Sequence, residues 1–196
     1  MNNLKKYIEN YSYVTMKDLR NKGFQTRDIR ELVNNGFVIK IKPGLYKYSK
    51  LNIDNEGFID ISKSVTHGII CLVSALEYHN LSTINPEKIY VAIPHSEKKV
   101  NVIYPPTKFF FFRKRYYDIG IEKVQTEIGS FKIYIPEKTI CDMFRYRNKL
   151  GEDLALEGLK NYLKRQDANI NKLWKYAIRT RVKTIIKPYM KAMVAE

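Results

Sequence analysis

The strongest constraint in this sequence is a series of short helical patterns that ends in a hairpin. A first helix opens the chain, with an apolar stripe at Leu4, Tyr7 and Ile8. In a second helix, Thr15 and Asp18 have the spacing of a capping box, and Gly23 stands where a left-handed residue ends a helix. Thr26 is placed to cap a third helix, which Gly36 closes.

Residues 36–50, GFVIKIKPGLYKYSK, predict a β-hairpin around a Pro-Gly turn. Because side chains alternate along a strand, one set should face inward and the next outward. The expected inward set is Phe37, Ile39 and Ile41. The expected outward set is Val38, Lys40 and Lys42. Lysines on an exposed strand protect a sheet edge from aggregation, or they contact the phosphates of a nucleic acid.

Three helices followed by a hairpin have the order and spacing of a winged helix-turn-helix, in which one helix enters the major groove of DNA. In the third helix Ile29, Leu32 and Val33 share one face, and polar residues occupy the other. The residues predicted to reach base edges are Gln25, Thr26, Arg27, Arg30 and Asn34. The residues predicted to reach phosphates are Lys40, Lys42 and Lys47. The alternative is an interaction module, since winged helices also bind proteins, and Glu31 places a negative charge on this face.

The formal charge of +15 is concentrated at the two ends of the 196-residue chain. Residues 1–50 hold 11 Lys and Arg against 4 Asp and Glu, and residues 139–196 hold 13 against 6. The middle, residues 51–138, is nearly neutral, with 11 against 10. Basic surfaces attract nucleic acid by releasing counterions from phosphates. The alternative source of the charge is a general preference for Lys, Asn and Ile, as in an organism with an AT-rich genome.

The polar segment NIDNEG, between about Leu51 and Phe58, predicts a linker between residues 1–52 and a second domain, residues 53–196. In the second domain we expect a helix over 67–82, ended by Asn80, and strands over 88–94, 108–115 and 130–136. Four helices should follow over 136–147, 152–166, 171–179 and 182–193, and Pro188 should end or kink the last. The predicted fold class is α+β: a winged helix-turn-helix, then a larger mixed domain with a helical C-terminal part.

No combination of residues gives a convincing catalytic or metal site. His67 and Cys71 are one helical turn apart and His79 follows, but no carboxylate or second cysteine completes a zinc pattern. Glu137, Lys138 and Asp142 resemble the acidic residues and lysine of metal-dependent nucleases, at an unspecific spacing. We therefore expect no enzymatic activity, no cofactor and no metal. A metal-dependent enzyme that processes nucleic acid is the alternative.

The run Phe109–Phe112 is followed by Arg113, Lys114 and Arg115, which suggests stacking of single-stranded bases beside a basic rim. Four consecutive phenylalanines place two on each face of a strand, however. A strand buried on both faces is the favoured interpretation.

Several segments together resemble the AbiEi-type antitoxins and transcriptional regulators of bacterial abortive-infection (AbiE) systems. The matching segments are GFVIKIKPGLY, SALEYHNL, IYVAIP and YIPEKTICDMFRYR. The family usually has Gly at the position of Asn80. The resemblance implies a repressor whose winged helix binds inverted repeats in its own operator, and a larger domain that counters a nucleotidyltransferase toxin without a stable complex. In this chain, repression would rest on residues 25–34 and the wing lysines.

The basic C-terminal segment is a candidate for a second DNA contact or for RNA, or it is a set of solvated helix faces. Its cations are Lys160, Lys164, Arg165, Arg179, Arg181 and Lys183. No apolar run has the length of a membrane span, and the N-terminus lacks a secretory pattern. Two distant cysteines, Cys71 and Cys141, are expected to be reduced. We therefore expect a cytoplasmic protein.

Overall fold

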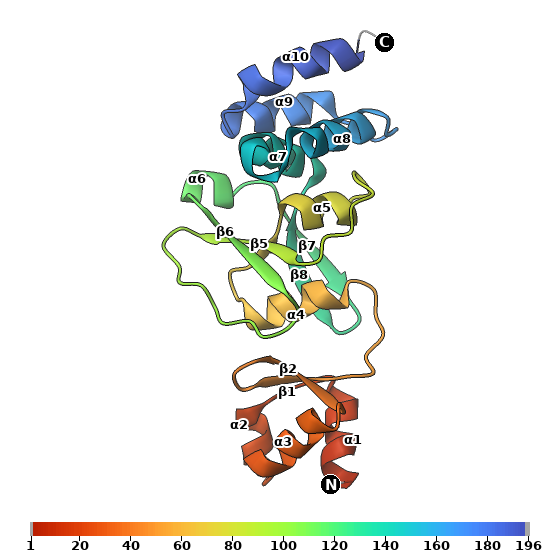
Figure 1. Ribbon diagram of the computed structural model, residues 1–196, viewed down its shortest axis with the longest axis vertical. Coiled ribbons are helices and arrows are strands. Elements are labelled where there is room, and N and C mark those ends of the chain that lie inside the picture. Colours follow the sequence, from red (N-terminus) through yellow and green to blue (C-terminus); the bar gives the residue numbers. More distant parts are fainter. Residues whose placement is uncertain (1, 195–196) are drawn as a thin grey trace.

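The structure, a computed structural model, describes residues 2–194 and has a mixed α+β fold with two separate sheets. Its parts follow one another along the long axis of the molecule (Figure 1). Three helices and a three-stranded sheet lie at the N-terminal end, a five-stranded sheet lies in the middle, and a layer of helices forms the C-terminal end. Within the described residues, no helix has both the length and the apolar composition that crossing a bilayer requires.

The N-terminal unit, residues 2–48, has the element order helix, strand, helix, helix, strand, strand. Its helices are α1 (Asn2–Tyr11), α2 (Met16–Asn21) and α3 (Thr26–Asn34). Its strands are β1 (Tyr13–Thr15), β2 (Val38–Lys42) and β3 (Leu45–Tyr48). The strands pair antiparallel in the order β1-β3-β2. Apolar residues from all three helices and all three strands share one core.

The helix ends follow the expected local chemistry, with one correction. Thr15 caps α2 and accepts a hydrogen bond from the Asp18 amide, as predicted. Gly23 and Gly36 adopt φ values of 81° and 72°, which only glycine adopts freely. The cap of α3 is Gln25 rather than Thr26: the Gln25 amide donates to Asp28 Oδ2 over 3.2 Å. The helix therefore begins one residue earlier than Thr26 capping would allow.

The predicted inward and outward sets of the hairpin are wrong for Val38 and Ile39, whereas Phe37 packs against the N-terminal core and Ile41 is buried, as expected. Val38 is only 2% exposed and packs against the helices, whereas Ile39 lies opposite Lys47 on the other face of the sheet. A register irregularity between Lys40 and Lys42 then changes the phase, and Ile41 is fully buried. Both faces of this sheet are covered, so alternation did not reveal which face was inward.

The second sheet contains both parallel and antiparallel pairs, in the strand order β6-β5-β4-β8-β7. Its strands are β4 (Ile69–Ile70), β5 (Ile89–Pro94), β6 (Thr107–Phe112), β7 (Ile121–Thr126) and β8 (Gly129–Tyr134). Helix α4 (Glu56–Ser64) lies on the side of the N-terminal unit, and α5 (Leu72–Tyr78) and α7 (Pro136–Leu150) lie on the opposite side (Figure 1). Each side of the sheet therefore has its own hydrophobic core.

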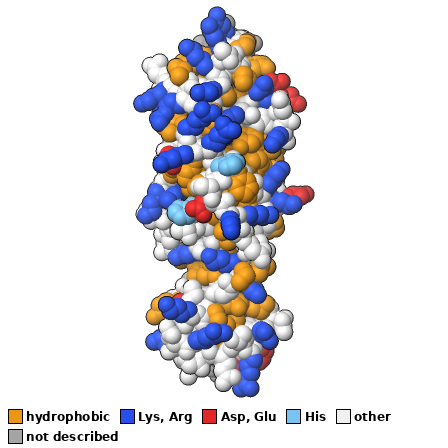
Figure 2. Space-filling model, turned by 90° about the vertical axis from the view of Figure 1, so that its left-hand side faces the viewer, with side chains coloured by type: hydrophobic (Ala, Val, Ile, Leu, Met, Phe, Trp, Pro, Cys, Tyr) orange, Lys and Arg blue, Asp and Glu red, His pale blue; other side chains and the backbone are white. Residues whose placement is uncertain are grey.

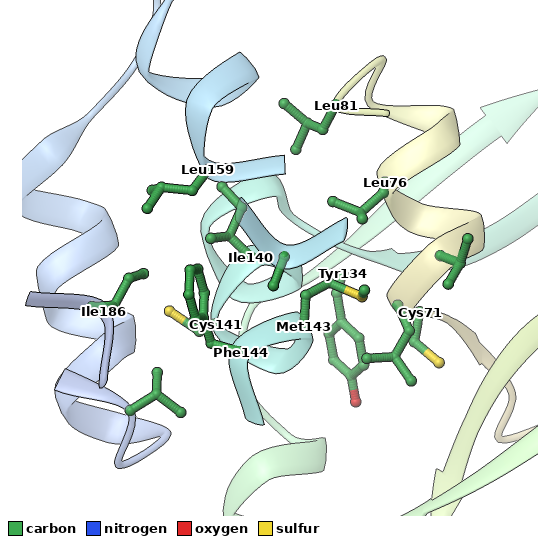
Figure 3. Packing of buried hydrophobic residues seen from close by; sticks show 14 of the residues in the cluster. Cys71, Leu76, Leu81, Tyr134, Ile140, Cys141, Met143, Phe144, Leu159 and Ile186 are labelled. Carbon is green, nitrogen blue, oxygen red and sulfur yellow. The ribbon is translucent and has the colours of Figure 1, made fainter. Parts of the chain in front are cut away.

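Helix α7 is the centre of the C-terminal core. Ile140, Cys141, Met143 and Phe144 on α7 point toward neighbouring helices and the sheet, where Leu76, Leu159 and Ile186 meet them (Figure 3). The remaining helices are α6 (Lys114–Tyr117), α8 (Glu152–Leu163), α9 (Ile170–Arg179) and α10 (Lys183–Val194). Pro188 lies inside α10 and does not end it.

Most elements of the second part lie where they were predicted, and the differences have clear causes. Asn80 ends α5 with φ 55°, as expected. The predicted linker is shorter, because α4 begins at Glu56, and the predicted 67–82 helix begins with strand β4. Strand β7 and helix α6 were not predicted. In the phenylalanine run, Phe110 and Phe112 are buried and Phe109 packs against the core on the α4 side, whereas Phe111 is 44% exposed on the edge strand β6.

A buried polar cluster joins the N-terminal unit to α4, and we call it the junction. Lys47 of β3 is 1% exposed, and its Nζ lies 2.6 Å from both Asp60 Oδ2 and Glu56 Oε1. Tyr13 donates to Asp60 Oδ1 over 2.7 Å. Burial disfavours the Lys47 ammonium, but its two carboxylate partners outweigh this effect and raise its pKa. Lys47 is therefore held as a cation inside the protein.

Backbone contacts and a second lysine extend the junction. Lys42 Nζ donates to the Ser64 carbonyl over 2.8 Å. The amides of Ile103 and Tyr104 both point to the Ile41 carbonyl, at 2.8 and 3.2 Å. The face of the hairpin that carries Ile39 and Lys47 thus contacts the second part of the protein and not the helices of its own unit. The sheet of the N-terminal unit lies between its own helices and α4 (Figure 1).

Removing the Lys47 ammonium should leave the buried Asp60 carboxylate without a cation, with the Tyr13 hydroxyl as its remaining partner. We expect Lys47→Ala to lower the free energy of unfolding by about 3–5 kcal/mol. Lys50→Ala, a matched change at an exposed lysine just after β3, should change it by less than about 0.5 kcal/mol. Chemical denaturation followed by circular dichroism measures both. Equal stability of the two variants would contradict the assigned role of Lys47.

Because His79 is partly buried, we expect the protein to become less stable as the pH falls. Its Nε2 lies 2.8 Å from the Tyr134 carbonyl oxygen, and burial lowers the pKa of His79 below its ordinary value of 6.5 despite this hydrogen bond. Unfolded His79 thus takes up a proton at a higher pH than folded His79. The contribution of His79 to the free energy of unfolding is fully present above pH 6.5. It is lost as the pH falls through the folded pKa, with a slope of at most about 1.4 kcal/mol per pH unit. In denaturation series from pH 7.5 to 5, His79→Gln should be less pH-dependent than the wild type; parallel curves would contradict this account.

Candidate nucleic-acid interface

Helix α3 presents a polar and basic face to solvent. Its apolar side, with Ile29 and Leu32, is buried in the N-terminal core. Gln25, Arg27, Arg30 and Asn34 are exposed, and the Arg27 side chain reaches 81% exposure. The sequence therefore predicted the exposed side of α3 correctly.

The N-terminal end of α3 is positioned by contacts with its neighbour. Thr26 is half-buried, and its hydroxyl lies 3.5 Å from Arg20 Nη2 on α2. Arg27 Nε lies 3.5 Å from Asp28 Oδ1, a weak pairing that leaves the guanidinium in solvent. Arg20 was not selected from the sequence, and it adds an exposed cation beside the start of α3. Its position after the predicted cap of α2 gave no signal that it would approach Thr26.

The three lysines predicted to contact phosphate have different environments. Lys47 is buried between Asp60 and Glu56 and cannot reach a ligand in this arrangement. The Lys42 ammonium is hydrogen-bonded to the Ser64 carbonyl. Lys40 is half-buried on the helix-facing side of the hairpin, opposite Tyr46. We therefore keep Lys40 as a candidate and correct the interpretation of Lys42 and Lys47, because both belong to the junction.

Positive charge continues beyond the N-terminal unit. Figure 2 shows Lys and Arg side chains along the whole length of one face, and most densely over the helical C-terminal end. Lys160, Lys164, Arg179, Arg181 and Lys183 are exposed. Arg165 differs from them, because it forms a two-point pair with Asp167, at 2.7 Å each, and donates to the His79 carbonyl. Arg165 thus stabilises the end of α8.

The residues of the alternative nuclease site do not form one accessible group. Glu137 accepts from the Tyr162 hydroxyl over 2.9 Å, lies 3.2 Å from Lys172 Nζ, and lines a hollow of about 410 Å³. Lys138 and Asp142 are fully buried and form an ion pair with each other. Burial lowers the pKa of Lys138, whose Nζ lies 4.1 Å from the centre of the Tyr134 ring. Their partners are internal, so these residues have no shared access to a substrate.

The residues considered as metal ligands, His67, Cys71 and His79, have different environments. Cys71 is buried at the start of α5, and burial raises the pKa of its thiol well above the usual range. His79 binds the Tyr134 carbonyl, and His67 is exposed. In the part of the chain that the structure describes, no three His, Cys, Asp or Glu side chains are grouped to hold a metal ion.

Comparison with known proteins bears on the fold. No family model matches the sequence, and no curated protein matches it. The crystal structure of RV2827C protein from Mycobacterium tuberculosis is similar, with a TM-score of 0.64 over 93% of this chain and 74% of that chain. The two sequences are 11% identical, so the similarity concerns the fold alone. Because it covers nearly the whole chain, the N-terminal unit and the second sheet are found together in both proteins.

Proposed function

We propose that this protein binds duplex DNA in a sequence-specific manner, with its N-terminal unit acting as a winged helix-turn-helix. The single observation that carries the proposal is the solvent-facing side of α3, where Arg27, Arg30, Gln25 and Asn34 stand together above a buried apolar side. Arginine pairs with guanine, and Asn and Gln pair with adenine, in the major groove. The order of helices and strands in the unit agrees with that of winged-helix proteins.

The phosphate contacts in this proposal come from few residues. Lys40 on β2 and Arg20 beside the start of α3 flank the helix. Lys42 and Lys47 are excluded from the set, since the junction uses both. Positioning on the DNA backbone therefore relies more on α2 and α3 than on the hairpin.

The resemblance to AbiEi-type antitoxins supports a more specific role. In this role the protein represses its own operon through inverted repeats, and its second part counters a nucleotidyltransferase toxin without a stable complex. The four matching segments form β2 and β3, α5, β5 and α7, which include central elements of both parts. The proposed role is one of binding rather than catalysis, and it places the protein in the cytoplasm, where the operator is.

Arg27→Ala should weaken binding to the cognate operator by about 1–3 kcal/mol and reduce the preference for it over unrelated DNA, because a base contact is lost. Selection from a random duplex library, followed by fluorescence anisotropy with the selected site and a scrambled site, measures both effects. Lys123→Ala, at an exposed position on β7, is the control and should bind as the wild type does.

Lys40→Ala provides a contrast, because a phosphate contact carries no sequence information. It should weaken binding to all duplexes alike and reduce the slope of log K against log salt by about one. If Arg27→Ala and Lys40→Ala changed affinity and preference in the same way, the assignment of α3 to base recognition would be wrong.

A growth assay tests the antitoxin role independently of DNA binding. Co-expression of this chain should relieve growth inhibition by a nucleotidyltransferase toxin encoded beside it. The Arg27→Ala variant should relieve it equally, because α3 is not part of the second unit. Growth inhibition that persists with the wild-type chain at matched expression would refute the antitoxin role and leave the DNA-binding proposal intact.

A further inference from the structure

Two adjoining hollows lie along the edge strand β6, far from α3. One, of about 730 Å³, is lined by β6, the segment before β5 and the end of α7. The other, of about 390 Å³, is lined by the end of β6, the start of α6 and α7. Phe111 and Lys149 line both hollows, so the two form one continuous surface. We call this surface the β6 groove.

The lining of the β6 groove is strongly basic. Its cations are Lys88, Lys99, Lys108, Arg113, Lys149 and Arg145, and Arg145 differs from the others because it is largely buried and lies 3.6 Å from Asp142 Oδ1. Among the described residues that line it, one carboxylate is present, on Glu87. A concave surface with this charge concentrates anions. Residues 51–138 are nearly neutral as a whole, but positive charge is concentrated locally at β6.

Aromatic rings line the same groove. Phe111 is exposed on β6, and the half-buried Tyr116 and Tyr146 line the second hollow. The Arg145 guanidinium lies 4.2 Å from the Tyr116 ring centre and 5.0 Å from that of Tyr146. In the first hollow, Lys108 Nζ lies 5.1 Å from the Tyr90 ring centre. The groove thus combines an exposed phenylalanine ring with cations that lie against half-buried tyrosine rings.

We propose that the β6 groove binds single-stranded nucleic acid. Aromatic faces stack with bases of any sequence, and cations beside them neutralise the phosphates that connect those bases. A duplex keeps its bases inside and would leave Phe111 unused. An acidic peptide would satisfy the cations but would have no planar groups for the rings. This proposal goes beyond duplex recognition by α3 and does not depend on it.

Binding is tested with the full-length protein and fluorescein-labelled ten-nucleotide oligomers, rU10 and dT10, by anisotropy. Phe111→Ala removes an exposed ring and should weaken binding between about 5- and 150-fold, as expected for the loss of one stacked base. Lys149→Ala should reduce the slope of log K against log salt by about 0.7. Ile121→Ala and Lys123→Ala on β7, at the opposite edge of the sheet, are matched changes at exposed positions and should leave both quantities unchanged.

Three outcomes would overturn the proposal. One is binding by Phe111→Ala and Lys149→Ala that equals that of the β7 controls. Another is a loss of single-strand binding in Arg27→Ala as large as in Phe111→Ala, which would assign the oligomer to α3. The third is displacement of the oligomer by deca-glutamate as effective as by unlabelled rU10, which would indicate an acidic peptide or any polyanion. Photocrosslinking of 4-thiouridine oligomers to the peptide that holds Phe111 should occur and gives an independent measurement.

Discussion

The position of the N-terminal unit on the second part of the protein depends on one buried ammonium group. Lys47 stands on β3, and its two carboxylate partners, Asp60 and Glu56, stand on α4. A buried charge is tolerated only with close partners, so the sheet and the helix can approach each other in few ways. Tyr13 and the Ile41 carbonyl add directional hydrogen bonds to the same contact. The α3 surface therefore has a defined position relative to the second sheet.

Local chemistry explains what the sequence predicted well. Caps and left-handed glycines depend on residues three to six positions apart, and Thr15, Gly23, Gly36 and Asn80 behave as expected. The phase of the hairpin was wrong for a physical reason. Alternation identifies two faces but not which one is buried, and here both are. Asp60, which pairs with the buried Lys47, is 13 residues away on another element, so no local sequence pattern reveals the contact.

In the candidate sites too, local features could be predicted from the sequence and long-range features could not. The exposed side of α3 follows from helical periodicity, because the helix has one buried stripe. The fate of Phe111 could not be predicted, since it depends on β6 being an edge strand in the order β6-β5-β4-β8-β7. A run of four phenylalanines is typical of a strand covered on both faces. The strand order is a long-range property, and it leaves one of the four rings in solvent.

The two covered faces of the N-terminal sheet have an evolutionary consequence. A unit that folds by itself is easily recombined with new partner domains. In this protein the N-terminal unit presents Tyr13, Ile39 and Lys47 to α4, and a new partner would have to supply carboxylates at matching positions. If the N-terminal unit alone were exchanged, Lys47 would be buried in an interface without a carboxylate to pair with it. The two parts are therefore expected to be inherited together.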